Sequence, residues 1–110
     1  EQYRYAMQCY KHALTSWKSI HGKNHPLTAV SMNNIGTMKV KISSKKVDDA
    51  LSDYEKSLNI LNKVVTENHP LVADTYQLIG DAFLHHKANK ATALENYSKA
   101  LSIRNAILGK

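Results

Sequence analysis

Histidine is the residue type that most invites a chemical role here, because imidazole binds metal ions and exchanges protons near neutral pH. Six histidines are present, with a single cysteine, Cys9. Their spacing is not typical of a metal site. His25 and His69 occupy equivalent places in two similar passages, and the adjacent His85 and His86 are expected to point to different faces of a helix. We therefore expect no metal site and no other cofactor.

Catalysis is not indicated either. A catalytic triad needs a nucleophile, a base and an acid in mutual contact, and spacing in sequence alone does not establish one. No passage combines these residue types, or two carboxylates, in a supporting context. Cys9 follows Ala6 by three residues in an apolar pattern, so we expect it to pack as a small side chain. The sequence predicts a protein that is not an enzyme.

Positive charge is the second feature with a chemical consequence. Fifteen Lys and Arg against nine Asp and Glu give a formal net charge of +6, which favours acidic partners over basic ones. Part of this charge is concentrated in the segment KVKISSKK, at Lys39, Lys41, Lys45 and Lys46. We interpret this segment as a solvated turn, with a contact surface as the alternative.

The elements that carry these residues are repeated. The passage NHPLTAVSMNNIG at 24–36 returns as NHPLVADTYQLIG at 68–80, with seven of thirteen positions identical. A second passage, ALSDYEKSLNIL at 50–61, returns as ALENYSKALSIR at 93–104 and more faintly as AMQCYKHALTSW at 6–17. In each copy of the second passage Ala, Tyr and Leu recur at i, i+4 and i+8, which places them on one helical face. Leu51, Leu61 and Leu94 widen that face.

Both passages predict helices. Proline favours the first helical position, so His25 and His69 are the expected N-caps. Gly36 and Gly80 fall in mid-helix, where glycine costs about 1 kcal/mol relative to alanine, and we expect close helix contact there. We call the helices formed by the NHP passage type A and those formed by the second passage type B. The sequence predicts five helices in the order B-A-B-A-B, near 2–20, 26–42, 47–65, 70–87 and 90–108. The predicted fold class is all-α, a solenoid of antiparallel helix pairs that share one core by stacking.

The sequence resembles the tetratricopeptide repeat, in which helix A carries a small residue, helix B carries an Ala and an aromatic residue, and a proline precedes the next unit. These positions are Gly36, Gly80, Ala50, Ala93, Tyr54, Tyr97, Pro26 and Pro70. The offsets of 44 and 43 residues, and the NHP turn, look like the kinesin light chain type of this repeat. The resemblance spans essentially the whole chain. It implies a noncatalytic scaffold or adaptor, with cargo adaptors as one case, that binds a partner peptide in a concave groove.

The same resemblance implies which residues line that groove, since in this family the A helices form it. Counting from the two helical glycines, the predicted peptide-binding residues are Asn33, Asn34, Thr37, Lys41, Gln77, Asp81 and His85. Amide side chains pair with a peptide backbone irrespective of its sequence, and Lys41 would select a carboxylate. Alternatively, these polar residues only solvate an exposed helix face.

The remaining expectations concern the whole chain. We expect residues 1–110 to form a single domain that is a segment of a longer protein. No apolar run approaches the roughly 18 residues of a membrane helix, and no secretory start is present, so we expect a cytoplasmic, non-inserted and, for a motor adaptor, cytoskeleton-associated protein. Two other functions remain open: nucleic-acid binding through the basic surface, and self-association through uncapped ends.

Overall fold

The computed structural model describes residues 1–109. They form five α-helices, α1 (Gln2–His21), α2 (Pro26–Ile42), α3 (Val47–Val64), α4 (Pro70–His86) and α5 (Lys90–Leu108), with a short 3-10 helix, η1 (Ser44–Lys46), before α3. No strand occurs among the described residues, which confirms the all-α prediction. The predicted bounds differ from the observed ones by a single residue, at the ends of α1, α3 and α4. Each helix in residues 1–109 is too short or too polar to span a lipid bilayer.

The two A-type helices, α2 and α4, begin in the same way. Pro26 and Pro70 occupy the first helical position, and the preceding histidines have extended backbones with φ of −135° and −106°, because a proline ring disfavours the helical conformation of the residue before it. The Nδ1 atom of His25, and likewise that of His69, accepts a hydrogen bond of 3.1 Å from the main-chain N–H two residues further on. The N-cap prediction is confirmed.

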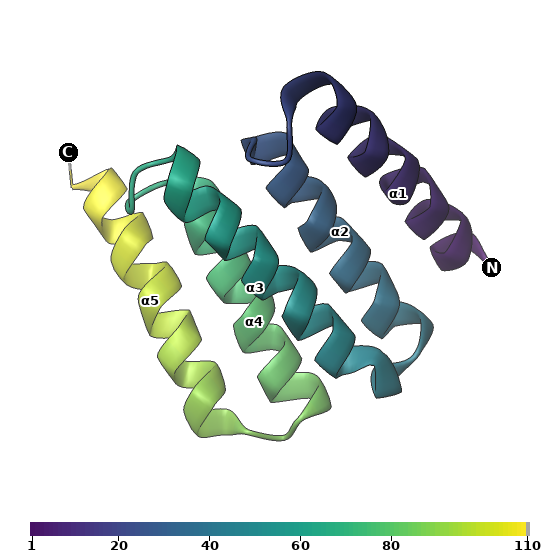
Figure 1. Cartoon of the computed structure of the whole chain (residues 1–110). Coiled ribbons are helices and arrows are strands. Elements are labelled where there is room, and N and C mark those ends of the chain that lie inside the picture. Colours follow the sequence, from purple (N-terminus) through teal and green to yellow (C-terminus); the bar gives the residue numbers. More distant parts are fainter. Residues whose placement is uncertain (110) are drawn as a thin grey trace.

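The helices form two layers. Helix α2 lies between α1 and α3, α4 lies between α3 and α5, and α2 also contacts α4 directly. Figure 1 shows α3 in front of α4, with α1 and α5 at the two ends of the row. The result is a slab with extents of 37 × 34 × 19 Å. This is the predicted solenoid of helix pairs.

The core lies where α2, α3 and α4 meet. One buried cluster comprises Ala29, Ile60, Leu61 and Val72, and a second comprises Val47, Ala50, Tyr54 and Ala82. Leu61 is fully buried, and full burial of a leucine side chain is worth about 1.5–3 kcal/mol. Because both clusters combine residues from α3 with residues from α4, each helix pair is stabilised by its neighbour.

The two helical glycines mark close helix contacts, as predicted. A Cβ atom on Gly36 would lie 2.9 Å from Cε1 of Tyr54 and 3.2 Å from the main-chain oxygen of Ala50. A Cβ atom on Gly80 would lie 2.6 Å from Cε1 of Tyr97. Carbon atoms normally approach to about 3.5–4.0 Å, so only a hydrogen atom fits at either place without a shift of the neighbouring helix or ring.

Two predictions about packing are wrong. Cys9 is exposed, because it lies two residues from Met7, the buried residue of α1, and side chains two apart point to nearly opposite sides of a helix. Leu94 and Leu101 are 63% and 58% exposed and belong to neither core cluster. No helix follows α5 in the described residues. The face of α5 that is equivalent to the α4-facing side of α3 is therefore uncovered.

Candidate peptide-binding groove

The seven residues predicted to line a groove all border two adjoining hollows between α2 and α4. The first hollow, of about 340 Å³, is lined by Asn33, Asn34, Gln77 and Asp81 among others. The second, of about 280 Å³, is lined by Thr37, Lys41, Asp81 and His85 among others. Leu78 and Asp81 border both hollows. We refer to the two together as the α2–α4 groove. That a peptide binds there stays a prediction.

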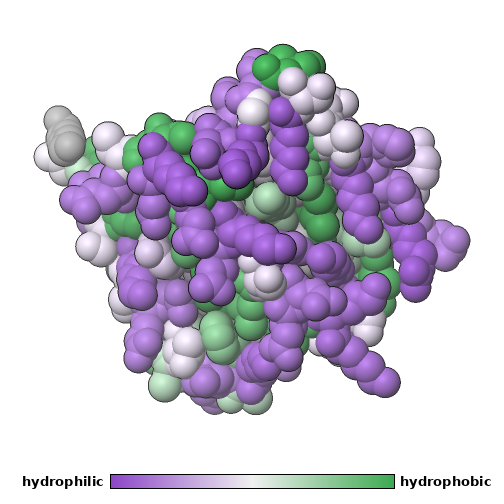
Figure 2. Space-filling model, in the orientation of Figure 1, coloured by the Kyte–Doolittle hydropathy of each residue, from purple (hydrophilic) through white to green (hydrophobic). Residues whose placement is uncertain are grey.

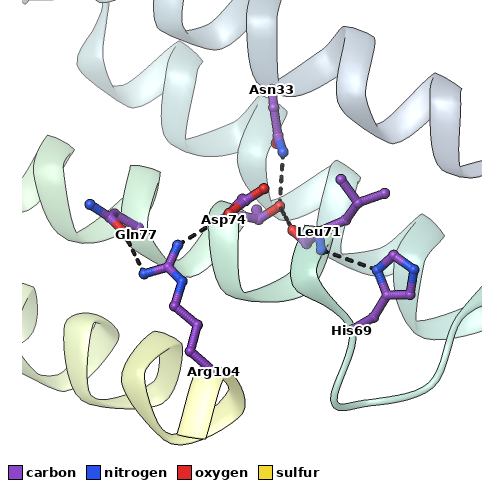
Figure 3. A network of polar contacts seen from close by, with 7 residues as sticks. Asn33, His69, Leu71, Asp74, Gln77 and Arg104 are labelled. Carbon is purple, nitrogen blue, oxygen red and sulfur yellow. Dashed lines mark hydrogen bonds and ion pairs between the residues drawn. The ribbon is translucent and has the colours of Figure 1, made fainter. Parts of the chain in front are cut away.

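Asn33 joins the two A-type helices. Its side chain is 6% exposed, and its Nδ2 atom donates a hydrogen bond of 2.8 Å to Oγ1 of Thr75, which donates in turn to the main-chain oxygen of Leu71. Figure 3 shows Asn33 pointing from α2 towards α4. Oδ1 of Asn33 is buried and has no hydrogen-bond partner within residues 1–109. Buried polar atoms are nearly always paired, so this oxygen is an acceptor that the described chain leaves unused.

Thr37 and Asp81 are held by tyrosines of the B-type helices. Oγ1 of Thr37 lies 2.9 Å from the hydroxyl of Tyr54, and the hydroxyl of Tyr97 donates to the carboxylate of Asp81. Burial, followed by the hydrogen bond and charge of Asp81, raises the pKa of Tyr97 to about 12. Burial also raises the pKa of Tyr54. Both phenols are therefore protonated at neutral pH, and they position the groove side chains.

Arg104 closes one side of the first hollow. Its guanidinium donates to Oε1 of Gln77 at 2.6 Å and to the carboxylate of Asp74 at 3.1 Å, reaching from α5 to α4 (Figure 3). Sequence reasoning missed Asp74 and Arg104. A usable signal was present, because Arg104 occupies the place that the buried Leu61 holds in the preceding copy of the passage.

Other groove side chains, among them Asn34 and Lys41, make no side-chain hydrogen bond or ion pair within the described residues. Asn34 is half-buried, and its side chain makes no hydrogen bond within the described residues. Nζ of Lys41 lies 5.4 Å from the ring centroid of Tyr3, a cation–π distance. Asp74, Asp81 and Arg104 border the first hollow, and Asp81 also borders the second, together with Lys41 and two histidines. The groove thus carries both signs of charge, although the chain as a whole has a net positive charge.

The two adjacent histidines of α4, His85 and His86, both border the second hollow. A rotation of 100° per residue still lets neighbours flank one depression when it is wide. Within residues 1–109, no group of three or more His, Cys, Asp or Glu side chains is arranged to hold a metal ion.

The KVKISSKK segment spans the end of α2 and η1. Lys39 forms an ion pair of 2.8 Å with Asp53, and Lys41 lies over Tyr3. Lys45 and Lys46 are in η1, where Lys45 is exposed. Half of these lysines therefore make contacts within the chain.

Comparison with known protein families gives a match to the tetratricopeptide repeat over residues 39–106. This range covers most of the chain, from the end of α2 through α5. The chain belongs to the tetratricopeptide repeat family. Tetratricopeptide repeats form a noncatalytic scaffold fold that generally mediates contacts between proteins.

Two fungal proteins are similar to this tetratricopeptide segment. A clustered mitochondria protein homolog from Candida albicans is 28% identical over 109 residues, which are 99% of this chain and 8% of the relative. A clustered mitochondria protein homolog from Emericella nidulans is 30% identical over 95 residues, which are 86% of this chain and 7% of the relative. The chain therefore spans less than a tenth of the length of either relative.

Proposed function

We propose that this chain is a protein-interaction module that binds a partner peptide in the α2–α4 groove. The observation that carries the proposal is the half-buried amide of Asn34, which borders the groove and makes no side-chain hydrogen bond within residues 1–109. Oδ1 of Asn33, by contrast, is enclosed and out of reach of a bound peptide. An extended peptide offers main-chain N–H and C=O groups in alternation, and an amide side chain can satisfy one of each.

The subtype forms a narrower part of the proposal. The NHP turn and the offsets of 44 and 43 residues support the kinesin light chain-like form of the repeat, in which the function is that of an adaptor in the cytoplasm. The printed name of both relatives refers to clustered mitochondria. We infer that the longer protein containing this segment acts on the distribution of mitochondria, with the groove recruiting a partner protein.

The groove can be tested with peptides selected from a phage-displayed random library on the wild-type chain. Calorimetry would then compare the selected peptide on wild type and on Asn34→Leu. Leucine occupies the equivalent place, Leu78, in the second copy of the passage, so this substitution is compatible with the fold. Loss of one or two hydrogen bonds, at about 0.5–1.5 kcal/mol each, predicts a roughly tenfold weaker affinity.

The matched control is Lys11→Ala, which alters an exposed side chain outside the groove. It is expected to leave the affinity unchanged. If Asn34→Leu bound the peptide as tightly as wild type, the groove would not be the binding site. For the cellular part of the proposal, the measurement is the spread of mitochondria in cells that express the full-length protein with or without this segment. An unchanged distribution would refute that part alone.

A further inference from the structure

A hollow of different character lies on the far side of α2 from the groove. It has a volume of about 250 Å³ and sits between the ends of α1 and α3. Four lysines border it, and no acidic residue does: Lys18, Lys23, Lys56 and Lys63. We call it the basic hollow. Met32, which also borders it, is two residues from Asn34 of the groove, and side chains two apart point to nearly opposite sides of a helix.

The four lysines have no carboxylate partner among the described residues. The ion pairs in residues 1–109 involve Lys39, Lys87 and Arg104 instead. Lys18 and Lys63 lie in the last turns of α1 and α3, where a cation compensates the helix dipole. That explanation does not extend to Lys23, which lies in a loop, or to Lys56, which is in the middle of α3.

The next repeat contains an equivalent hollow without this charge. It is bordered by Asn62, Glu67 and Lys99, among others, and has a volume of about 600 Å³. By the repeat alignment, Asn62 and Glu67 take the places of Lys18 and Lys23, and Ala106 takes the place of Lys63. The same helix arrangement thus forms with one lysine and one glutamate at its hollow. Because the fold does not require four cations there, their grouping indicates a ligand.

We propose that the basic hollow binds an acidic peptide segment of a partner protein. Four cations around one small depression complement a run of carboxylates. The apolar side chains of Met32 and Ile60 border the hollow and can accept an aliphatic side chain, while the amides of Asn24 and Asn59 can pair with a peptide backbone. Figure 2 shows hydrophilic residues flanking a smaller hydrophobic area between the upper parts of α1 and α3.

Other anionic ligands fit these residues less well. No aromatic side chain borders the basic hollow, so a single-stranded nucleic acid would lack the stacking platform that such proteins use. A phosphate or a lipid headgroup would use the lysines and leave the apolar part of the hollow uncovered. The module would therefore have two peptide sites on opposite sides of α2, the basic hollow being selective for negative charge.

The test uses a fluorescent peptide of glutamates around a single leucine, with anisotropy measured at low and physiological salt. The first variant combines Lys18→Asn, Lys23→Glu and Lys63→Ala, which gives the hollow the residues of the next repeat. The control combines Lys11→Glu and Lys45→Glu, two exposed lysines outside the hollow. Both variants lose the same net positive charge. We expect about a tenfold weaker affinity in the first variant and a much smaller change in the control, with binding of the wild type weakening as salt screens the charges.

A gain-of-binding variant completes the design. Adding Asn62→Lys, Glu67→Lys and Ala106→Lys to the first variant moves the charge to the next hollow and should recover part of the affinity. Equal losses in the first variant and the control would overturn the proposal, because net charge alone would then explain binding. Tighter binding of polyuridine RNA or of anionic phosphatidylserine vesicles, lost in the first variant but not in the control, would also overturn the peptide assignment. Circular dichroism of each variant verifies that helix content is unchanged. Since Asn34→Leu leaves the basic hollow intact, failure of one site is distinguishable from failure of the other.

Discussion

The substitution Gly36→Ala is expected to destabilise the protein more than Gly80→Ala, although the added methyl group meets a nearer atom at Gly80. In both helices alanine gains about 1 kcal/mol of helix propensity over glycine. At Gly36 the new Cβ atom lies 2.9 Å from the Tyr54 ring, 3.2 Å from the Ala50 main-chain oxygen and 3.3 Å from Cβ of Asp53. All three neighbours belong to one stretch of α3.

Relief of this overlap at Gly36 requires a movement of α3 itself. The ring of Tyr54 is 2% exposed and its hydroxyl is bonded to Thr37, so the ring cannot swing away. Overpacking of this kind costs about 1–3 kcal/mol. After the propensity gain is subtracted, we expect a net loss of up to about 2 kcal/mol in the free energy of unfolding for Gly36→Ala.

At Gly80 the three nearest atoms all belong to the ring of Tyr97, at 2.6 to 3.1 Å. That ring is only partly buried and lies on α5, the last helix described, so it can rotate outwards. The cost is its hydrogen bond to Asp81, about 1.5–3 kcal/mol at most for a bond to a charged group. Because the ring is only partly buried, water can replace that bond once the ring has rotated outwards, and we expect a net change near zero.

Urea denaturation followed by circular dichroism measures both variants. The expected result is a lower midpoint for Gly36→Ala with an unchanged slope, and a midpoint close to wild type for Gly80→Ala. Equal destabilisation, or a larger loss for Gly80→Ala, would refute the argument that the identity of the nearest atom decides the cost. A changed slope in either variant would mean that the two repeats no longer unfold together.

Three further predictions rest on single contacts. Leu61→Ala should lower the free energy of unfolding by about 2–5 kcal/mol in urea melts. Leu101→Ala, at a site 58% exposed, should lower it by less than about 1 kcal/mol. Similar losses in the two variants would contradict the assigned core. His69→Ala removes an N-cap acceptor and should cost about 0.5–2 kcal/mol, with faster hydrogen exchange confined to the first turn of α4 as the diagnostic result. Tyr97 should titrate near pH 12 by ultraviolet absorbance, and Asp81→Asn should bring that value down. Since the folded pKa lies above the ordinary tyrosine pKa of 10.0, Tyr97 favours folding below pH 10.0 and this contribution is lost as pH rises towards 12. A titration at the ordinary value would exclude the described contact with Asp81.

The repeat was the part of the sequence from which the fold could be predicted. Two copies of NHP followed by a helical pattern located the caps at His25 and His69, and two glycines at the same place located the close contacts. These features are local or repeat at fixed spacing, so periodicity reveals them. Exposure of Cys9 was not predictable in the same way, because it depends on which single side of α1 faces α2.

The candidate sites show the same division. The family resemblance implied which side chains of the A helices face a groove, and the structure places them beside two hollows. Nothing local indicated that Asn33 is buried and bonded to Thr75, because that bond joins residues 42 positions apart. The basic hollow was not predicted, since its lysines are dispersed between positions 18 and 63, whereas the local density of lysine is highest in the KVKISSKK segment. Comparison of equivalent positions would have revealed it, through Lys18 against Asn62 and Lys23 against Glu67.

The bond between Asn33 and Thr75 has a consequence for the shape of a longer array. Both side chains are almost completely enclosed. Sliding α4 along α2 by one residue would separate them and leave the enclosed amide of Asn33 without a partner, at about 1–3 kcal/mol, while Thr75 would keep its bond to Leu71. Contacts between apolar side chains tolerate such a slip far better, because the hydrophobic effect is non-directional. This single hydrogen bond therefore fixes the offset between successive units. The curvature of a solenoid is the sum of those offsets.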